Sequence, residues 1–216
     1  ASAQAKVMPF GRLDGANYQA VDVQQNESGW LTFTCKHQNH AVPFVLPVPA
    51  AHLLPSILGA IACAHQAGIS LERLARQAAH YQPLLGRCSL HSLGDGRTVI
   101  CDTVKAPFST LSLAFDLLND FPRSRPRRIV LGNVSDYPGS WTPKIKRISE
   151  QALSVADELI LHRPPAGIDR MVGRYGAERV ESFQTVAEIQ AYLQQEGTDE
   201  DVILLKSSGV NHLESL

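Results

Sequence analysis

Apolar segments of strand length alternate with amphipathic segments of helix length across the second half of the chain. From residue 86 onward the predicted segments are strands 88–92 and 98–101, helix 109–120, strand 128–132, helix 143–156, strand 158–162, a short helix near 167–174, strand 178–182, helix 185–195 and strand 201–205. Gly94-Asp-Gly96 is expected to join the first two strands as a hairpin. Because strands joined through helices form right-handed crossovers, this alternation predicts an α/β fold with a Rossmann-like, mostly parallel sheet flanked by helices.

The first half of the chain has a different pattern. Residues alternate in polarity over 18–23, 30–35 and 42–46, with turn-forming residues between these runs, which predicts antiparallel hairpin strands. Helices are predicted over 52–67 and 70–80. The chain is therefore expected to begin with a small α+β segment that precedes the Rossmann-like part.

A chain of 216 residues can form two small domains, and Gln82-Pro83 is the clearest break in its pattern. We therefore predict one domain of residues 1–83 and a second of residues 84–216. No apolar stretch reaches the ~20 residues that cross a bilayer, and no secretory signal pattern is present. A cytoplasmic location is expected.

The charges are balanced, with 20 Lys and Arg residues against 21 Asp and Glu residues. This balance argues against nucleic acid or a membrane surface as a partner. The one basic cluster is Arg123-Ser-Arg125-Pro-Arg127-Arg128, between a predicted helix and a predicted strand. Because no aromatic residues are interleaved with the arginines, we interpret this cluster as a solvated loop.

The cysteines show no paired spacing, so they indicate neither a disulfide framework nor a structural zinc site. They are predicted to be buried free thiols of a reducing compartment: Cys35, Cys63, Cys88 and Cys101. Soft and imidazole ligands do gather in Cys35-Lys-His37-Gln-Asn-His40, but no second pair stands at zinc spacing. Exposed histidines at a hairpin tip are the preferred interpretation, and no metal ligand is predicted.

Polar side chains follow three of the predicted parallel strands. Asp102 and Lys105 come after the second hairpin strand, and the turn-rich segment 131–139 follows the next strand. Lys206 and Ser208 end the last strand. Carboxyl ends of parallel strands meet at one sheet edge, where α/β proteins bind anionic ligands. An aspartate there can accept from ribose hydroxyls and a lysine can hold a phosphate or carboxylate; the alternative is a solvated turn.

Longer motifs occur in a fixed order along the chain. They are Val7-Met-Pro-Phe10-Gly11 with Tyr18-Gln-Ala20, Pro49-Ala-Ala-His52 with Gly68-Ile-Ser-Leu71-Glu72, Gly86-Arg87, Val99-Ile-Cys-Asp102 through Leu118, and Asp201-Val-Ile-Leu-Leu-Lys206-Ser-Ser208. The ordered set resembles the carboxyl-terminal half of a Mur ligase, one of the ATP-dependent amide ligases of peptidoglycan precursor synthesis. It is most similar to the branch that adds D-alanyl-D-alanine to a UDP-N-acetylmuramoyl tripeptide, as a divergent paralogue.

The resemblance implies a role for each part of the chain. Residues 1–83 would be the end of the central ATP-binding domain, and residues 84–216 the Rossmann-like carboxyl-terminal domain. The site residues that the resemblance implies are His52, Arg87 and Asp102 for ATP, Lys105 for the reacting groups, and Lys206 and Ser208 for the amino substrate.

The resemblance also implies ATP and Mg²⁺ as cofactors, in a reaction that makes an acyl phosphate and then an amide. The phosphate-binding loop would lie upstream of residue 1. The chain is therefore expected to act together with ATPase and amino-terminal substrate domains of the same protein, on a small-molecule or peptide-precursor substrate, and not to turn over ATP alone. The family's His-Asn-x-x-Asn reads His52-Leu53-Leu54-Pro55-Ser56 here, without the two nucleotide-facing asparagines. This departure keeps a second interpretation open, a non-catalytic module that binds a nucleotide or an acidic ligand.

Overall fold

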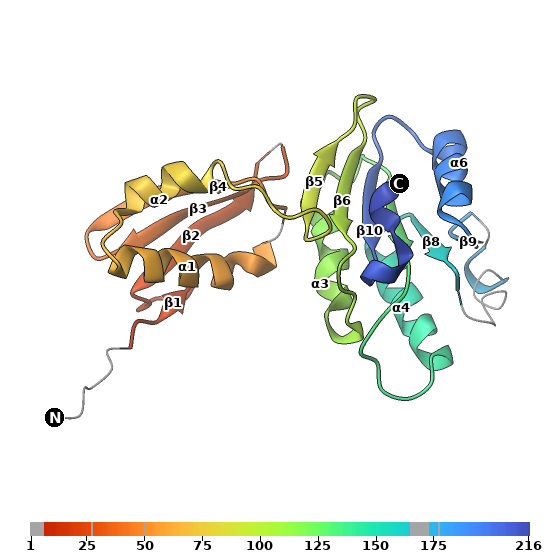
Figure 1. The fold of residues 1–216 in the computed structure, drawn as a ribbon, viewed down its shortest axis with the longest axis horizontal. Coiled ribbons are helices and arrows are strands. Elements are labelled where there is room, and N and C mark those ends of the chain that lie inside the picture. The colour runs from red at the N-terminus through yellow and green to blue at the C-terminus, as the bar shows by residue number, and fades with distance from the viewer. Residues whose placement is uncertain (1–6, 27, 50, 165–172, 177) are drawn as a thin grey trace. The chain divides into compact units, whose positions relative to one another are not determined.

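The computed structural model divides into two compact units, Ala1–Gln82 and Pro83–Leu216, and each is described by itself (Figure 1). The residues that the structure describes are 7–26, 28–49, 51–164, 173–176 and 178–216. Within these ranges no helix is both long enough and apolar enough to cross a membrane. The chain has the predicted α/β class, with an antiparallel sheet in the first unit and a mostly parallel sheet in the second.

The amino-terminal unit is a four-stranded sheet in the order β1-β2-β3-β4 with two helices. Its elements are β1 (Phe10–Gly11), β2 (Tyr18–Gln25), β3 (Leu31–His37), β4 (His40–Leu46), a 3₁₀ turn η1 (Ala51–Leu53), α1 (Leu54–Gln66) and α2 (Leu71–Ala78). The antiparallel pairing of β2, β3 and β4 confirms the predicted hairpins. The parallel pairing of β1 with β2 was not predicted, because a two-residue strand carries no periodicity.

The core of this unit forms on the apolar face of the sheet. In β3 the alternate side chains of Leu31, Phe33 and Cys35 are buried. They belong to one cluster with Tyr18 of β2 and Leu58 of α1, so the helix covers the face that the alternation makes apolar.

Two predictions of exposure are wrong in this unit. His37 is buried because it continues the core-facing alternation of β3, and its ring stacks on Tyr18 with centroids 4.2 Å apart. Its Nδ1 lies 2.6 Å from the carbonyl oxygen of Asn17, whereas His40 is exposed as predicted. Cys63 is exposed, because it lies on the face of α1 that points away from the core. The other three cysteines are buried free thiols.

The carboxyl-terminal unit is a six-stranded sheet in the order β5-β6-β10-β7-β8-β9. Its elements are β5 (Ser89–Ser92), β6 (Thr98–Asp102), the 3₁₀ turn η2 (Phe108–Thr110), α3 (Leu111–Phe115), η3 (Asp116–Asp120), β7 (Arg127–Leu131), α4 (Thr142–Val155), β8 (Glu158–His162), β9 (Val180–Phe183), α6 (Val186–Glu196), β10 (Val202–Lys206), η4 (Gly209–Asn211) and η5 (Leu213–Ser215). Only β5 runs antiparallel to its neighbour, which confirms the predicted mostly parallel sheet and its edge hairpin.

Helices pack on both faces of this sheet (Figure 1). The face that carries Val130, Ile160 and Ile203 is covered by α6 and by η5 at the end of the chain. Ile145 of α4 faces Leu131 on the other side, and α3 contacts α4. Because β10 inserts between β6 and β7, the last strand ends in the middle of the carboxyl edge.

One predicted helix is broken in the structure. The segment 109–120 is divided into η2, α3 and η3, so only five residues are α-helical. The Thr110 hydroxyl donates to the carbonyl oxygen of Pro107 at 3.2 Å, and such local bonds compete with helical ones. The short helix predicted near 167–174 lies largely outside the described residues.

Candidate functional site

The carboxyl ends of β6, β10 and β7 lie side by side at one edge of the sheet. Asp102 ends β6, Lys206 ends β10 in register with it, and Leu131 ends β7 beside Lys206. Lys206 Nζ lies 2.5 Å from Asp102 Oδ2 and 2.6 Å from the carbonyl oxygen of Lys105. The Lys206 and Asp102 side chains are only 5% and 17% exposed. The edge therefore contains a nearly buried ion pair that holds one carboxylate oxygen of Asp102.

Arg87 is held near this edge by a turn that requires glycine. Gly86 has a φ of +78°, and a Cβ there would lie 2.7 Å from Thr103 Oγ1. The Gly86 carbonyl oxygen accepts from the amides of Thr103 and Val104 at 3.0 and 3.1 Å. These bonds tie the turn to the loop after β6. Because Arg87 directly follows Gly86, its backbone is held near the end of β6, where Asp102 lies, while its side chain is exposed.

Cys88 is a buried thiol next to the ion pair. Burial, and then the neighbouring Asp102 carboxylate, raise the pKa of Cys88 to about 12. This shift favours the protonated thiol at neutral pH and disfavours the thiolate, which is the reactive form.

Ser208 is tied to the loop that follows β7. Its amide donates to the carbonyl oxygen of Asn133 at 2.9 Å, and its hydroxyl accepts from Asn133 Nδ2 at 3.0 Å. Gly132 permits this approach, because a Cβ there would lie 2.7 Å from Ser207 Cβ and 2.9 Å from Asn211 Oδ1. The segment after β10 is therefore locked to the end of β7.

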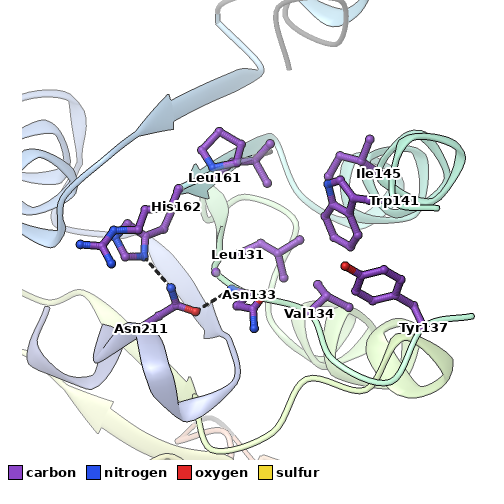
Figure 2. Close-up of a pocket in the computed structure, with 12 residues that line it drawn as sticks. Leu131, Asn133, Val134, Tyr137, Trp141, Ile145, Leu161, His162 and Asn211 are labelled. Atoms are coloured by element: carbon purple, nitrogen blue, oxygen red, sulfur yellow. Dashed lines mark hydrogen bonds between the residues drawn. The ribbon is translucent and has the colours of Figure 1, made fainter. Parts of the chain in front are cut away.

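A cavity of ≈430 Å³ lies at the carboxyl ends of β7 and β8 (Figure 2). On one side are the rings of Tyr137 and Trp141, with centroids 5.1 Å apart, and on the other are His162 and Asn211. The segment 131–139 was singled out from the sequence, but Trp141, His162 and Asn211 were missed. No local pattern marks them, because they come from three segments that meet only in the folded unit.

Asn211 joins the ends of β7 and β8 on the cavity wall. Its Oδ1 accepts from the Asn133 amide at 2.7 Å, and its Nδ2 lies 3.2 Å from His162 Nδ1. Because a backbone amide can only donate, Asn211 turns its NH₂ group toward the ring, and Nδ1 of His162 is the acceptor. Burial, and then the charge of Arg163, lower the pKa of His162. The ring is therefore neutral at physiological pH, with its proton on Nε2.

Replacing Asn211 with alanine is expected to lower the free energy of unfolding of this unit by about 1–3 kcal/mol, because the Asn133 amide and His162 Nδ1 lose their shared partner. Urea unfolding of the Trp30→Phe chain, followed by the fluorescence of Trp141, measures the change. Asn119→Ala is the matched control, since Asn119 is exposed and its loss is expected to cost under ~0.5 kcal/mol. Equal losses in both variants would contradict a structural role of the Asn211 bridge.

Five of the six predicted site residues lie at the carboxyl edge of one sheet: Arg87, Asp102, Lys105, Lys206 and Ser208. Their roles toward a ligand stay predictions. Lys105 is exposed, whereas Lys206 is buried. His52 is exposed within η1 and belongs to the amino-terminal unit.

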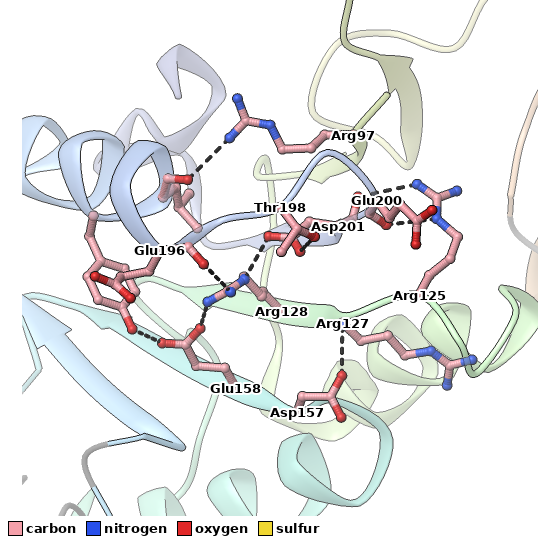
Figure 3. Close-up of polar contacts among 12 residues, drawn as sticks. Arg97, Arg125, Arg127, Arg128, Asp157, Glu158, Glu196, Thr198, Glu200 and Asp201 are labelled. Atoms are coloured by element: carbon pink, nitrogen blue, oxygen red, sulfur yellow. Dashed lines mark hydrogen bonds and ion pairs between the residues drawn. The ribbon is translucent and has the colours of Figure 1, made fainter. Parts of the chain in front are cut away.

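The opposite edge of the sheet carries a second polar network (Figure 3). Arg128 forms ion pairs with Glu158 and, at 2.7 Å, with Asp201. Arg128 Nη2 also donates to the carbonyl oxygen of Glu196 at 2.8 Å, and the Tyr192 hydroxyl donates to Glu158. The side chains of Glu158 and Asp201 are 5% and 0% exposed, so this network is part of the core and not a ligand site.

The prediction that the basic cluster is a solvated loop is therefore wrong for most of its arginines. Arg127 is 2% exposed because β7 begins there, and its amide donates to Asp157 Oδ2 at 2.9 Å. Arg125 Nε donates to the carbonyl oxygen of Glu200 at 2.8 Å. The sequence could not predict that these arginines are bound in the fold, because their hydrogen-bond partners lie 30 to 75 residues away along the chain.

No protein-family model and no curated protein sequence matches the chain. Solved structures do match. MurF from Acinetobacter baumannii has a TM-score of 0.80 at 19% identity, over 96% of this chain and 45% of that one. MurF ligase from Thermotoga maritima in complex with ADP has a TM-score of 0.75 at 16% identity, over 95% and 46%. Folylpolyglutamate synthase from Thermotoga maritima has a TM-score of 0.66 at 14% identity, over 92% and 46%.

These similarities extend through both units of the chain, while the chain spans less than half the length of each of these proteins. At sequence identities this low, the structural similarity shows a shared fold. The order of motifs in the sequence and the architecture agree, and the chain has the Mur ligase fold.

Proposed function

We propose that the chain is the carboxyl-terminal part of an ATP-dependent ligase that joins a carboxylate to an amine. The observation that carries this proposal is the placement of Arg87, Asp102 and Lys105 at the carboxyl edge of one parallel sheet. In α/β proteins this edge is where nucleotides and their phosphates bind. The fold likeness to several ligases, one of them in complex with ADP, supports it.

Each residue has a distinct part in this proposal. Asp102 accepts hydrogen bonds from the ribose hydroxyls of ATP, and Arg87 pairs with a phosphate. Lys206 acts as a positioning residue, because its ion pair fixes the Asp102 carboxylate. Lys105 extends its exposed ammonium group toward the reacting groups, where a fixed cation offsets the negative charge of the transition state. Ser208 would contact the amine substrate.

The remaining parts of the active site would come from elsewhere in a longer protein. ATP supplies the phosphoryl group that activates the carboxylate. Mg²⁺, as the partner of the ATP phosphates, would be bound mainly by an upstream ATPase domain. His52 would join that domain's nucleotide contacts. An amino-terminal substrate domain would bind the acceptor, a small molecule or peptide precursor such as those of peptidoglycan synthesis.

The ribose contact can be tested in the longer protein by comparing ADP with 2′,3′-dideoxy-ADP. Hydrogen bonds to a charged group contribute about 1.5–3 kcal/mol, so ADP is expected to bind roughly 10- to 100-fold more tightly. In Asp102→Asn this ratio is expected to fall toward one, because the carboxylate charge is gone. Isothermal titration measures all four affinities.

Asp116→Asn is the matched control, since Asp116 is an exposed carboxylate of the same unit and should leave the ratio unchanged. Equal binding of both nucleotides by the unmodified protein would remove Asp102 from the nucleotide site. ATP turnover by the 216-residue chain alone would contradict the proposal that an upstream domain supplies the rest of the active site. The second candidate, a non-catalytic nucleotide-binding module, would show the ribose preference but no ATP-dependent ligation in the longer protein.

A further inference from the structure

We infer that His37 and His65 form a proton-sensitive latch, which holds the end of α1 on the sheet of the amino-terminal unit while both rings are neutral and releases it when they gain protons. His65 lies in the last turn of α1, and His37 ends β3. The latch goes beyond the proposed function, since it needs neither a nucleotide nor a partner domain.

Tyr18, the first residue of β2, contacts both imidazole rings. Its phenol ring stacks on His37, with centroids 4.2 Å apart and planes 10° apart. Its hydroxyl oxygen lies 2.8 Å from His65 Nδ1. The rings of His65 and His37 meet edge to face at a centroid distance of 5.1 Å. Tyr18 is fully buried and His37 is 5% exposed, so these contacts join α1, β2 and β3 away from water.

The hydrogen bonds assign one proton to each ring. Gln66 Nε2 donates to the Tyr18 hydroxyl at 2.8 Å. Among the described residues His65 Nδ1 is the other partner of this hydroxyl, so Tyr18 donates its own proton to His65, whose ring proton is then on Nε2. The carbonyl oxygen of Asn17 can only accept, so His37 carries its proton on Nδ1. A second proton on His65 would occupy Nδ1 and leave the buried Tyr18 hydroxyl proton without an acceptor, which is costly.

Most charged groups around His65 also oppose its protonation. With both rings protonated, His65 and His37 would place two positive charges 5.1 Å apart. His40, at the start of β4, adds a third positive charge when it is protonated. Glu72 of α2 acts in the opposite direction; it lies 3.9 Å from His40 Nδ1, and the positive charge of Arg76 on the same helix partly offsets it. Burial, and then the charges of His37 and His40, lower the pKa of His65, whereas Glu72 reduces the shift.

Acid is therefore expected to open the latch. A histidine in an unfolded chain titrates near pH ~6.5, and the folded His65 binds its second proton less readily. Below the unfolded pKa the unfolded state binds more protons than the folded one. The stability that His65 contributes is thus present above about pH 6.5 and is lost as pH falls through the lowered folded pKa. The end of α1 is the part of the unit that loses its anchor.

The first test follows the stability of the amino-terminal unit against pH. The sequence contains two tryptophans, so Trp141→Phe leaves Trp30, next to β3, as the reporter. The urea midpoint of this chain is expected to fall by about 1 M between about pH 7.5 and about pH 5. His65→Gln keeps an acceptor for the Tyr18 hydroxyl but cannot be protonated, so it should lose at least about half of this fall.

His80→Gln is the matched control, since His80 is an exposed histidine of the same unit and its loss should leave the fall intact. Equal falls in the two variants, or no fall in the Trp141→Phe chain, would overturn the latch.

A second experiment uses the unmodified chain, so it decides the question even where His65→Gln does not fold. Two-dimensional ¹H–¹⁵N NMR of the imidazole rings reports which nitrogen carries the proton. The expected result at about pH 7.5 is a proton on Nε2 of His65 and on Nδ1 of His37. His65 should also titrate at a lower pH than the histidines of the same chain in concentrated urea. A proton on Nδ1 of His65, or a titration that is not lowered, would contradict the latch.

Discussion

Replacing Arg128 with methionine is expected to lower the free energy of unfolding of the carboxyl-terminal unit by about 3–5 kcal/mol. The substitution keeps a long apolar stem but leaves Glu158 and Asp201 without their shared cation. Both carboxylates are nearly inaccessible to water, so neither can recover its hydration. Removal of one partner from a buried pair is costly because the remaining charge is uncompensated.

The loss is expected to depend on pH. Burial raises the pKa of Glu158 above its usual value, although Tyr192 and Arg128 act against the shift. Between the unfolded and the raised folded pKa the folded state binds more protons, so this group's contribution to stability falls as pH rises. Without Arg128 the folded pKa of Glu158 rises further. The deficit of Arg128→Met relative to the unmodified chain should therefore be largest near neutral pH and should shrink toward about pH 5.

Urea unfolding of the Trp30→Phe chain, followed through Trp141, isolates the unit that contains Arg128. Arg147→Met is the control, since this arginine is exposed and lies 5.9 Å from the Phe108 ring, and its loss should cost under ~1 kcal/mol. Arg128→Met with Glu158→Gln should recover part of the loss. A pH-independent deficit, or no recovery, would contradict the assignment of the effect to the buried carboxylates.

Replacing Lys206 with methionine is expected to cost the same unit about 2–4 kcal/mol. The Asp102 carboxylate would lose its cation, and the carbonyl oxygen of Lys105 would lose a donor. The loss is expected to be smaller than that of Arg128→Met, because Asp102 is 17% exposed and can regain some hydration. Lys146→Met is the matched control, since the exposed Lys146–Glu150 pair of α4 should contribute under ~0.5 kcal/mol.

A double-variant cycle separates the ion pair from simple loss of packing. If the pair carries the effect, Lys206→Met together with Asp102→Asn should be more stable than Lys206→Met alone, since no unpaired charge remains. If the stability losses of the two single variants simply add in the double variant, the ion pair does not carry the effect. In the longer protein, Lys206→Met should also weaken the preference for ADP over 2′,3′-dideoxy-ADP, because Asp102 is no longer held in place. A structural role unconnected with the nucleotide would leave that preference intact.

Much of the fold could be predicted because its signals are local. The apolar runs that became β7, β8 and β10 and the glycine turn between β5 and β6 identify their own elements. Strand ends marked by Asp102 and Lys206 were expected at one edge because parallel strands end on the same side. Local signals fail where a polar side chain interrupts a helix, as at Thr110, and where a strand is as short as β1.

The sequence by itself determined most of the strands and helices, and that Asp102, Lys105 and Lys206 stand at strand ends. The tertiary structure alone decided which of these side chains meet. Lys206 reaches Asp102 across 104 positions because β10 inserts beside β6, and strand order is a property of the whole sheet. The same holds for Asn211 and His162, which close one cavity from separate segments. Side-chain periodicity reports which face is buried, but the partner on that face is set by packing between distant parts of the chain.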